Sequence, residues 1–377
     1  MENKAKRVFL VVLDSFGIGA APDAHEFGDE GASTLGSLIA TGALDIKNMT
    51  DYGFGEIDGV SLGRRTYPST VGRLREISRG KDTTVGHWEL MGLPSSHPLP
   101  TYPNGFPSRI IKAIEQATGR GVLCNLPYSG TKVIADYGKE HTESGKLIVY
   151  TSADSVLQIA AHEDIVPVEE LYSYCRMARE IAVGEDGVGR IIARPFAGNE
   201  GNYYRTENRR DFSLKPHGRT ALDILKSEGY DVIGVGKISD IFAGEGLTES
   251  YPTHGNAEGI EKAIELTGRD FNGLAFINLV DFDMLYGHRQ DAAGYTEAIN
   301  TFDKALPRMI EGLGAGDRLI ITADHGCDPS DDSTDHTREY VPYLLIGGEE
   351  RENLGTVSGF DYVGRTVLKL LGAKETI

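Results

Sequence analysis

Acidic and histidine side chains follow three apolar segments, at the points where buried strands are predicted to end. These segments span residues 7–13, 274–280 and 318–322. In open α/β sheets, ligands bind at the carboxyl ends of parallel strands, so the polar residues that follow are expected to converge. The candidates are Asp14, Asp283, His288, Asp324 and His325, joined further along the chain by His336.

Carboxylates and imidazoles are common ligands of divalent cations. Six of them exceed what one ion needs, whereas two ions about 3.5–4 Å apart would use them all and hold a phosphoryl group between them. Taken singly, each has a plainer interpretation: Asp14 could cap a helix, and an Asp–His pair could be a solvent-exposed turn. Together they predict a two-metal site for phosphoryl transfer.

A candidate nucleophile lies in the segment 80–89, which reads GKDTTVGHWE. A threonine hydroxyl is a poor nucleophile at neutral pH, but coordination to a divalent cation eases the loss of its proton. The alternative is a polar turn with a threonine-capped helix. The residues alone do not choose between Thr83 and Thr84.

Short apolar runs alternate with helical patterns along the chain, which indicates an α/β fold. Ser108 and Gly119 are the predicted caps of one helix. Pro307 predicts that another helix kinks or restarts. The predicted strands are 7–13, 146–150, 230–235, 274–280 and 318–322, and the predicted helices are 108–118, 168–182 and 296–310.

The chain has 377 residues, which favours two domains or one large domain with an insertion. Five prolines between residues 94 and 107 disfavour regular structure and indicate a linker. A second break is predicted at 215–218. The segment between the two breaks could be an inserted domain.

The composition, with 40% hydrophobic and 25% charged residues, is typical of a soluble globular protein. A formal net charge of −18 argues against nucleic acid as a partner. No apolar run reaches the roughly 20 residues of a membrane helix, and no signal peptide is evident, so we expect a cytoplasmic protein without a membrane partner. The three cysteines form no CxxC pair and are expected to be reduced, with Cys327 a packing residue beside the ligands.

Five motifs resemble bacterial phosphopentomutases: LVVLDSFGIGAAPDA, GKDTTVGHWELMG, YTSADSVLQIAAHE, NLVDFDMLYGHR and ITADHG…TDHTREYVP. The resemblance runs from about residue 7 to 342. It implies an α/β fold with an alkaline-phosphatase-like core, in which helices flank a central, mostly parallel sheet. It further implies a smaller inserted α/β cap domain. The core would comprise residues 1–97 and 217–377, and the cap residues 98–216.

The same resemblance implies a role for individual residues. Asp283, His288 and His336 would hold one metal ion, and Asp14, Asp324 and His325 would hold the other. Both ions are expected to be manganese. Thr83, directly after Lys-Asp, would be the phosphorylated nucleophile. The residues implied in substrate binding are Ser152, Asp154, Val156, Arg190, Arg205 and Lys237.

The implied activity interconverts ribose 1-phosphate, or its 2-deoxy analogue, with the 5-phosphate by intermolecular phosphoryl transfer. A sugar bisphosphate would serve as activator, and the partners would be small sugar phosphates. The rival interpretations are a cofactor-independent phosphoglycerate mutase, a phosphatase, and a non-catalytic metal-binding protein. Two features depart from the family pattern: Cys327 stands where asparagine is expected, and residues beyond about 347 match less well.

Overall fold

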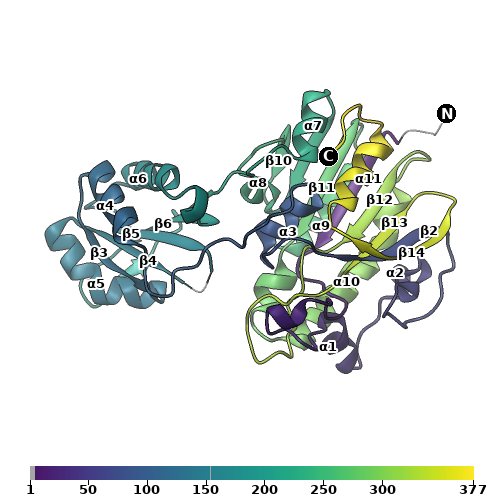
Figure 1. The fold of residues 1–377 in the computed structure, drawn as a ribbon, viewed down its shortest axis with the longest axis horizontal. Helices are drawn as coiled ribbons and strands as arrows, with labels where there is room; N and C mark the ends of the chain where they lie inside the picture. The colour runs from purple at the N-terminus through teal and green to yellow at the C-terminus, as the bar shows by residue number, and fades with distance from the viewer. Residues whose placement is uncertain (1–4, 153) are drawn as a thin grey trace. The chain divides into compact units, whose positions relative to one another are not determined.

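The structure is a computed structural model, and it describes residues 5–152 and 154–377 (Figure 1). The chain forms two compact units. The larger unit holds the described residues up to Pro98 together with Pro216–Ile377, and the smaller unit is Leu99–Lys215. The chain therefore leaves the larger unit once and returns to it. The functions expected of the two units remain predictions.

The larger unit is built on an eight-stranded sheet with the order β10-β9-β11-β1-β12-β13-β2-β14. Only β13 runs antiparallel to the others. The mostly parallel central sheet predicted from the sequence is confirmed. Its strands are β1 (Arg7–Leu13), β2 (Ser69–Arg75), β9 (Asp231–Val235), β10 (Glu249–Tyr251), β11 (Gly273–Leu279), β12 (Arg318–Thr322), β13 (Val341–Ile346) and β14 (Arg351–Ser358).

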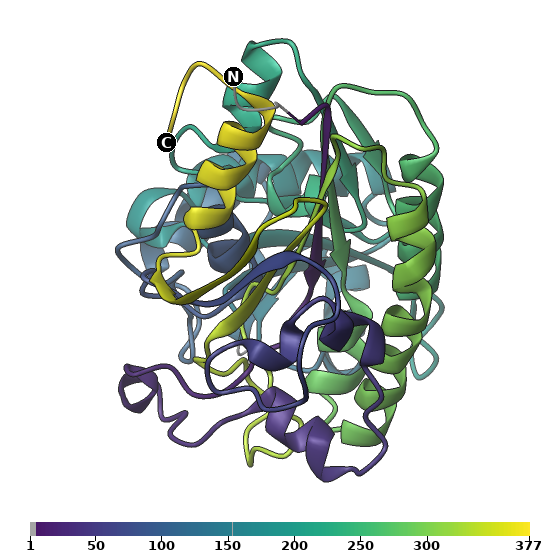
Figure 2. The ribbon, with the colours of Figure 1, turned by 90° about the vertical axis from the view of Figure 1, so that its right-hand side faces the viewer.

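Helices cover both faces of this sheet, with α10 (green) on one side and α11 (yellow) on the other in Figure 2. The strands in the middle are consequently apolar on both faces, as expected for parallel strands between helical layers. The helices are α1 (Thr34–Ala40), α2 (Lys47–Asp51), α3 (Thr83–Leu90), α7 (Ala221–Ser227), α8 (Ile238–Ile241), α9 (Asn256–Thr267), α10 (Ala292–Glu311) and α11 (Tyr362–Leu371).

Strand β1 lies between β11 and β12 and is parallel to both. All its residues after Arg7 are buried. The register pairs Leu13 with Leu279 of β11 and Val12 with Thr322 of β12. The carboxyl ends of the three strands therefore lie side by side, and the polar residues after them start from one edge of the sheet.

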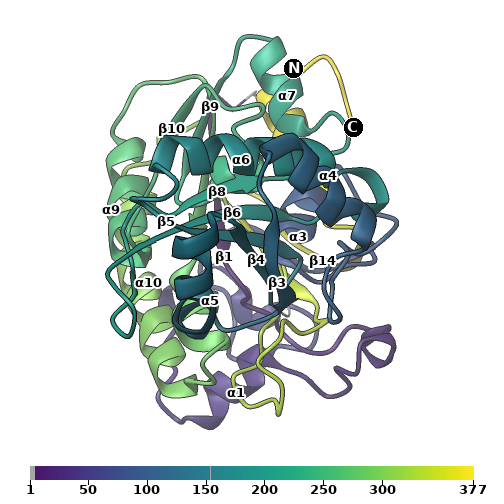
Figure 3. The same cartoon turned by 90° about the vertical axis from the view of Figure 1, so that its left-hand side faces the viewer.

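The smaller unit contains a mixed sheet with the order β3-β4-β5-β6-β7, and β8 also pairs with β6. Two helices lie along one of its faces and a third lies on the other (Figure 3). The smaller α/β unit expected from the sequence is thus present. Its elements are α4 (Ser108–Thr118), β3 (Val122–Pro127), α5 (Gly130–Ser144), β4 (Leu147–Thr151), β5 (Val156–His162), α6 (Val168–Ile181), β6 (Arg190–Ala197), β7 (Tyr204–Arg205) and β8 (Arg210–Ser213).

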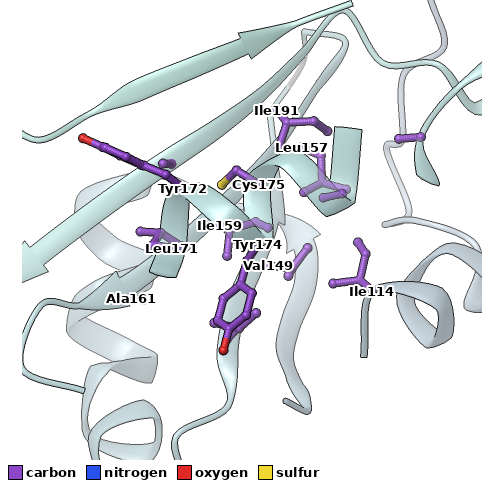
Figure 4. Packing of buried hydrophobic residues seen from close by; sticks show 14 of the residues in the cluster. Ile114, Val149, Leu157, Ile159, Ala161, Leu171, Tyr172, Tyr174, Cys175 and Ile191 are labelled. Carbon is purple, nitrogen blue, oxygen red and sulfur yellow. The ribbon is translucent and has the colours of Figure 1, made fainter. Parts of the chain in front are cut away.

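A continuous apolar core joins α4 and α6 to the sheet of the smaller unit (Figure 4). Ile114 of α4, Cys175 of α6 and Leu157 of β5 are fully buried within it. Burial raises the pKa of the Cys175 thiol well above its usual value, so this cysteine behaves as a small apolar residue. All three cysteines are free thiols.

Two local predictions need correction. The N-cap of α4 is Pro107 rather than Ser108, because Pro107 has extended backbone angles while Ser108 is already helical. The restart expected as one alternative at Pro307 does not occur, because α10 continues to Glu311, and the other alternative, a kink, stays a prediction. Proline leaves the carbonyl four residues earlier without its helical donor. Here the side-chain amide of Asn48 donates to that carbonyl, at Asp303, over 3.0 Å.

Across residues 5–152 and 154–377, no helix is both long enough and apolar enough to cross a membrane.

Candidate metal centre

The six predicted metal ligands come together at the carboxyl edge of the larger sheet. Asp14 follows β1, Asp324 and His325 follow β12, and Asp283 lies in a π-helical turn, Phe282–Gly287, that follows β11. His336 is more distant in the sequence. A short antiparallel bridge between Gly326 and Thr337 brings its segment beside the others.

The first ligand group consists of Asp283, His288 and His336. The Nε2 atoms of the two histidines lie 3.1 Å apart. The two carboxylate oxygens of Asp283 each lie 3.3 Å from one of these nitrogens. The Asp283 carboxylate therefore lies against the Nε2 atoms of both histidines.

The second ligand group consists of Asp14, Asp324 and His325. The Nε2 atom of His325 lies 3.5 Å from Asp14 Oδ1 and 3.2 Å from Asp324 Oδ2. All three side chains are buried. Asp283 and His336 can also form a ligand set with His325, so the two groups adjoin.

Hydrogen bonds fix the orientation of all three histidines. In each ring Nδ1 donates to a main-chain carbonyl: His325 to Gly326 over 3.0 Å, His336 to Lys81 over 3.0 Å, and His288 to Thr334 over 2.6 Å. Since a carbonyl only accepts, Nδ1 carries a proton, which leaves Nε2 as the ring nitrogen that faces the other ligand candidates. Such an outer hydrogen bond typically holds a histidine that binds a metal.

Three buried carboxylate oxygens also indicate that cations fit this site. Asp14 Oδ1, Asp283 Oδ1 and Asp324 Oδ2 are buried, and no donor in the described part of the chain hydrogen-bonds to them. A buried charged oxygen without a partner is costly. Divalent cations would satisfy these oxygens together with the three Nε2 atoms, so the donor set fits two such ions.

The electrostatics of the site also favour positive charge. Burial and the nearby charge of Asp324 raise the pKa of Asp14 to about 7. Burial opposes a charge on His288, yet its interaction with Asp283 raises the pKa of this histidine to about 12. The carboxylates therefore stabilise positive charge at this place, and a divalent cation would supply such a charge.

Thr83 reaches the second ligand group from the first residue of α3. Its Oγ1 atom lies 2.9 Å from Nε2 of His325. The preceding Asp82 caps the helix by accepting hydrogen bonds from the amides of Thr84 and Val85. Of the two threonines that the sequence left open, Thr83 has its hydroxyl at the predicted ligands.

A close approach between α3 and β12 makes this contact possible. A Cβ atom on Gly86 would lie only 2.2 Å from the main-chain oxygen of Asp324. Any larger residue would move the helix and Thr83 away from the metal centre. Gly86 therefore supports the position of Thr83 through packing.

Sequence reasoning missed two residues that hold the second ligand group. Asn278 of β11 donates to Asp14 Oδ2 over 2.7 Å. His87 of α3 donates from Nδ1 to the carbonyl of Thr83, and the same nitrogen lies 3.0 Å from Asp324 Oδ2. A signal was present in each case, because Asn278 interrupts an apolar strand and His87 lies one helical turn after Thr83.

Cys327 lies close to the first ligand group. Its sulfur, a carboxylate oxygen of Asp283 and a ring nitrogen of His288 could together hold an ion. The side chain is buried, and burial raises the pKa of its thiol. This favours the neutral thiol, and the role of Cys327 as a packing residue stays a prediction.

The predicted substrate residues are divided between the two units. Lys237 belongs to the larger unit, where its Nζ atom lies 3.8 Å from the sulfur of Met284. In the smaller unit, Val156 is buried and pairs in register with Arg190, whose Nη1 atom lies 3.7 Å from Asp211. Ser152 is half-buried, and Asp154 and Arg205 are exposed.

A buried arginine anchors the segment before Thr83. Arg338 forms an ion pair with Glu76 and a second with Asp23 over 2.9 Å, and also donates to the carbonyl of Gly80 over 2.9 Å. Its side chain is 2% exposed. Replacing Arg338 with methionine should lower the free energy of unfolding by about 3–5 kcal/mol, because the buried carboxylate of Glu76 loses its partner. Chemical denaturation measures the change.

Arg365→Met is the matched control. Arg365 forms an ion pair with Asp361 over 2.9 Å, one turn apart on α11, and is half exposed. Its loss should cost less than about 1 kcal/mol. Equal losses in the two variants would contradict the anchoring role of Arg338.

Comparison with known proteins shows which superfamily this chain belongs to. The model of the metalloenzyme superfamily matches residues 6–375. The structure of the PH0037 protein from Pyrococcus horikoshii shares the fold, with a TM-score of 0.54 at 15% identity, covering 100% of this chain and 99% of that one. The chain is thus a member of the metalloenzyme superfamily, with side chains arranged for divalent cations.

Curated relatives narrow the assignment further. Phosphopentomutases of Lachnoclostridium phytofermentans and Acetivibrio thermocellus are each 52% identical over 377 residues, covering 99% of this chain and 97% of theirs. That of Carboxydothermus hydrogenoformans is 52% identical over 378 residues with the same coverage. The chain belongs to the phosphopentomutase family, as its motifs predicted, and is accordingly an enzyme of the isomerase class.

Proposed function

We propose that this protein interconverts ribose 1-phosphate, or 2-deoxyribose 1-phosphate, with the corresponding 5-phosphate through a phosphorylated Thr83. The observation that carries the proposal is the position of the Thr83 hydroxyl, 2.9 Å from His325 and beside two groups of ligand candidates. An enzyme that only hydrolysed phosphate esters would not need the additional substrate residues predicted in the smaller unit.

Two divalent cations, held by the first and second ligand groups, would neutralise the phosphoryl oxygens and favour the alkoxide form of Thr83. The chain's own residues have separate tasks. The Nδ1 hydrogen bonds keep the histidine Nε2 atoms directed at the site. Asn278 orients Asp14, and His87 fixes the first turn of α3, so the hydroxyl of Thr83 is held in place.

The reaction proceeds in two balanced transfers. The free hydroxyl of the sugar monophosphate attacks the phosphorus of phospho-Thr83. A sugar O–P bond forms, the bond from phosphorus to Oγ1 breaks, and the hydroxyl proton passes to solvent. In the second transfer, Oγ1 of Thr83 attacks the other phosphate of the resulting 1,5-bisphosphate. The bond from phosphorus to Oγ1 forms, the sugar O–P bond breaks, and the sugar oxygen takes up a proton from solvent, which releases the product. A sugar bisphosphate can phosphorylate Thr83 at the start, which explains an activator.

Phosphorus NMR tests this activity directly. Ribose 1-phosphate is mixed with the protein, Mn²⁺ and a trace of a sugar 1,6-bisphosphate, and a sample with chelator serves as control. The proposal expects the 5-phosphate signal to grow without inorganic phosphate, and to vanish in the chelated sample. Release of inorganic phosphate instead would establish a phosphatase. Inactivity on ribose 1-phosphate combined with turnover of phosphoglycerate would establish the rival mutase.

Arg190 is proposed to bind the phosphate that does not react. Replacing it with alanine should raise KM for ribose 5-phosphate by about 10- to 100-fold, the worth of one or two charge-assisted hydrogen bonds. Arg109→Ala is the control, because Arg109 is exposed and pairs with Asp186. Steady-state kinetics should show less than a twofold change for this control. Equal KM values for wild type and Arg190→Ala would exclude this role.

Manganese as the native metal, the sugar bisphosphate activator and the cytoplasmic location remain predictions. Manganese is consistent with the donor set, since carboxylates and imidazoles suit this ion.

A further inference from the structure

Ser15 directly follows the ligand candidate Asp14 and has an unusual backbone conformation. Its φ angle of 71° lies in the left-handed region, which residues other than glycine rarely adopt. Its side chain is fully buried. Such a conformation persists only where the surrounding contacts impose it, and it is frequent at functional sites. The contacts of Ser15 therefore indicate its role.

The main chain at Ser15 joins two members of the second ligand group. Asp14 still belongs to the sheet, since its amide donates to the carbonyl of Leu279 over 3.3 Å. The next amide, that of Ser15, donates to Oδ1 of Asp324 over 3.1 Å. The other oxygen of Asp324, Oδ2, lies 3.2 Å from Nε2 of His325. Ser15 thus holds one oxygen of Asp324 and leaves the other directed at the second ligand group.

Tyr295 of α10 holds Ser15 in this position. Its Oη atom lies 2.9 Å from Oγ of Ser15, within hydrogen-bond distance, and donates to the main-chain oxygen of Asp14 over 3.4 Å. The side chain of Tyr295 is fully buried. A buried phenol usually finds a hydrogen-bond partner, and breaking such a bond leaves a costly unpaired group. The hydroxyl of Tyr295 therefore constrains the segment that carries Asp14.

The ring of Tyr295 packs against the segment that carries the first ligand group. It stacks on Phe282 at a centroid distance of 5.7 Å and an interplanar angle of 18°, and it lies 6.3 Å from the ring of Tyr286. Both rings belong to the π-helical turn that contains Asp283. Turns of this kind are rare and frequent at functional sites. The ring therefore constrains the segment of Asp283.

A single side chain thus contacts the segments of both ligand groups, at opposite ends of its own length. Two-metal catalysis of phosphoryl transfer needs ions about 3.5–4 Å apart, so the spacing of the two groups matters as much as the geometry within each. Residues that orient metal ligands without binding the metal typically affect metal affinity or activity 10- to 100-fold.

We propose that Tyr295 is a positioning residue that fixes the spacing of the two metal ions. Its hydroxyl holds the second ligand group through Ser15, and its ring holds the first through Phe282. This inference rests on the two-metal site of the proposed function. It adds a residue that the motifs and the family resemblance did not indicate.

Three substitutions separate the two contacts. Tyr295→Phe deletes the hydroxyl and keeps the ring, whereas Tyr295→Leu removes both. Ser15→Ala deletes the partner hydroxyl. The matched controls are Tyr343→Phe and Tyr343→Leu, because Tyr343 of β13 is fully buried as well but packs against Tyr362 of α11, with ring centroids 5.3 Å apart. The helices α10 and α11 cover opposite faces of the sheet (Figure 2).

Calorimetric titration of the full-length, metal-depleted protein with Mn²⁺ measures one dissociation constant for each ion. Tyr295→Phe and Ser15→Ala should each weaken one ion by about 10-fold and leave the other unaffected, and Tyr295→Leu should weaken both. The double variant Ser15→Ala/Tyr295→Phe should bind no worse than either single variant, because both delete the same contact. The Tyr343 variants should bind both ions normally, even where their melting temperatures fall.

The weakened ion is assigned by repeating Tyr295→Phe in the Asp283→Asn variant. This variant keeps only the second ligand group, so its one remaining ion should be bound about 10-fold more weakly once the hydroxyl is lost. An unchanged affinity there would exclude action on the second group.

Other outcomes would also contradict the inference. Equal weakening of both ions by Tyr295→Phe, or similar weakening by the Tyr343 variants, would show a general loss of stability. Losses that multiply in the double variant would exclude action through Ser15. A wild type that binds no Mn²⁺ would refute the metal centre of the proposed function and the inference with it. Two ions bound equally well by the wild type and the Tyr295 variants would refute the inference alone.

Discussion

Replacing Thr83 with alanine is expected to abolish isomerisation while leaving metal binding intact. The loss in kcat should be at least about 10⁴-fold, because without Oγ1 there is no atom to accept the phosphoryl group. The main chain and the cap by Asp82 are unaffected, so the helix and the six ligand candidates should keep their positions. Coupled assays measure the rate, and calorimetry with Mn²⁺ measures the metal sites.

Thr84→Ala is the matched control for this substitution. Thr84 is adjacent in the same helical turn, and its amide rather than its hydroxyl takes part in the cap. It should retain activity within a few-fold of wild type. A Thr83→Ala enzyme with substantial activity, or a Thr84→Ala enzyme without any, would refute the nucleophile assignment.

Replacing Asp283 with asparagine should remove one metal site and nearly all activity. Asparagine has the same shape, but it lacks the charge that faces His288 and His336. We expect binding of Mn²⁺ to fall from two ions to one, and activity at limiting Mn²⁺ to fall at least about 100-fold. The reason is that the loss of a residue that only orients a metal ligand already lowers metal affinity or activity 10- to 100-fold. Metal titration and kinetics measure the two effects.

Protein stability provides a separate readout of the same site. A cation that binds only the folded state at 100 times its dissociation constant adds about 2.7 kcal/mol. Mn²⁺ should therefore raise the melting temperature of the wild type more than that of Asp283→Asn. Asp281→Asn is the control, because Asp281 accepts from the amide of Asn256 over 2.6 Å instead. If Mn²⁺ left the melting temperature of the wild type unchanged, the metal centre as described would be wrong.

The sequence was sufficient to predict where the metal-ligand candidates that directly follow strands would lie. Asp14 and Asp324 come after apolar runs that had to be neighbouring parallel strands, so their convergence followed from the topology. His336 follows no strand, and a bridge between Gly326 and Thr337 positions it. Periodicity does not reveal such a pairing, so His336 was included as a candidate because it follows Asp324 and His325 closely in the sequence, and no strand end indicated its position.

Other features depended on contacts that no local pattern specifies. The residues alone left the choice between Thr83 and Thr84 open, and the family resemblance implied Thr83. The structure adds the contact of the Thr83 hydroxyl with His325, which no local pattern specifies. The unbroken helix at Pro307 required a donor from Asn48, a residue far away in the sequence. Packing partners of this kind lie outside the reach of reasoning from composition and spacing.

The most direct test of the account is to locate the phosphate on the enzyme. The protein is incubated with Mn²⁺ and a sugar 1,6-bisphosphate, digested, and mapped by mass spectrometry before and after ribose 1-phosphate is added. The account predicts phosphate on Thr83 that is transferred to the sugar without release of inorganic phosphate. An active enzyme that carries its phosphate on another residue, or on none, would contradict it.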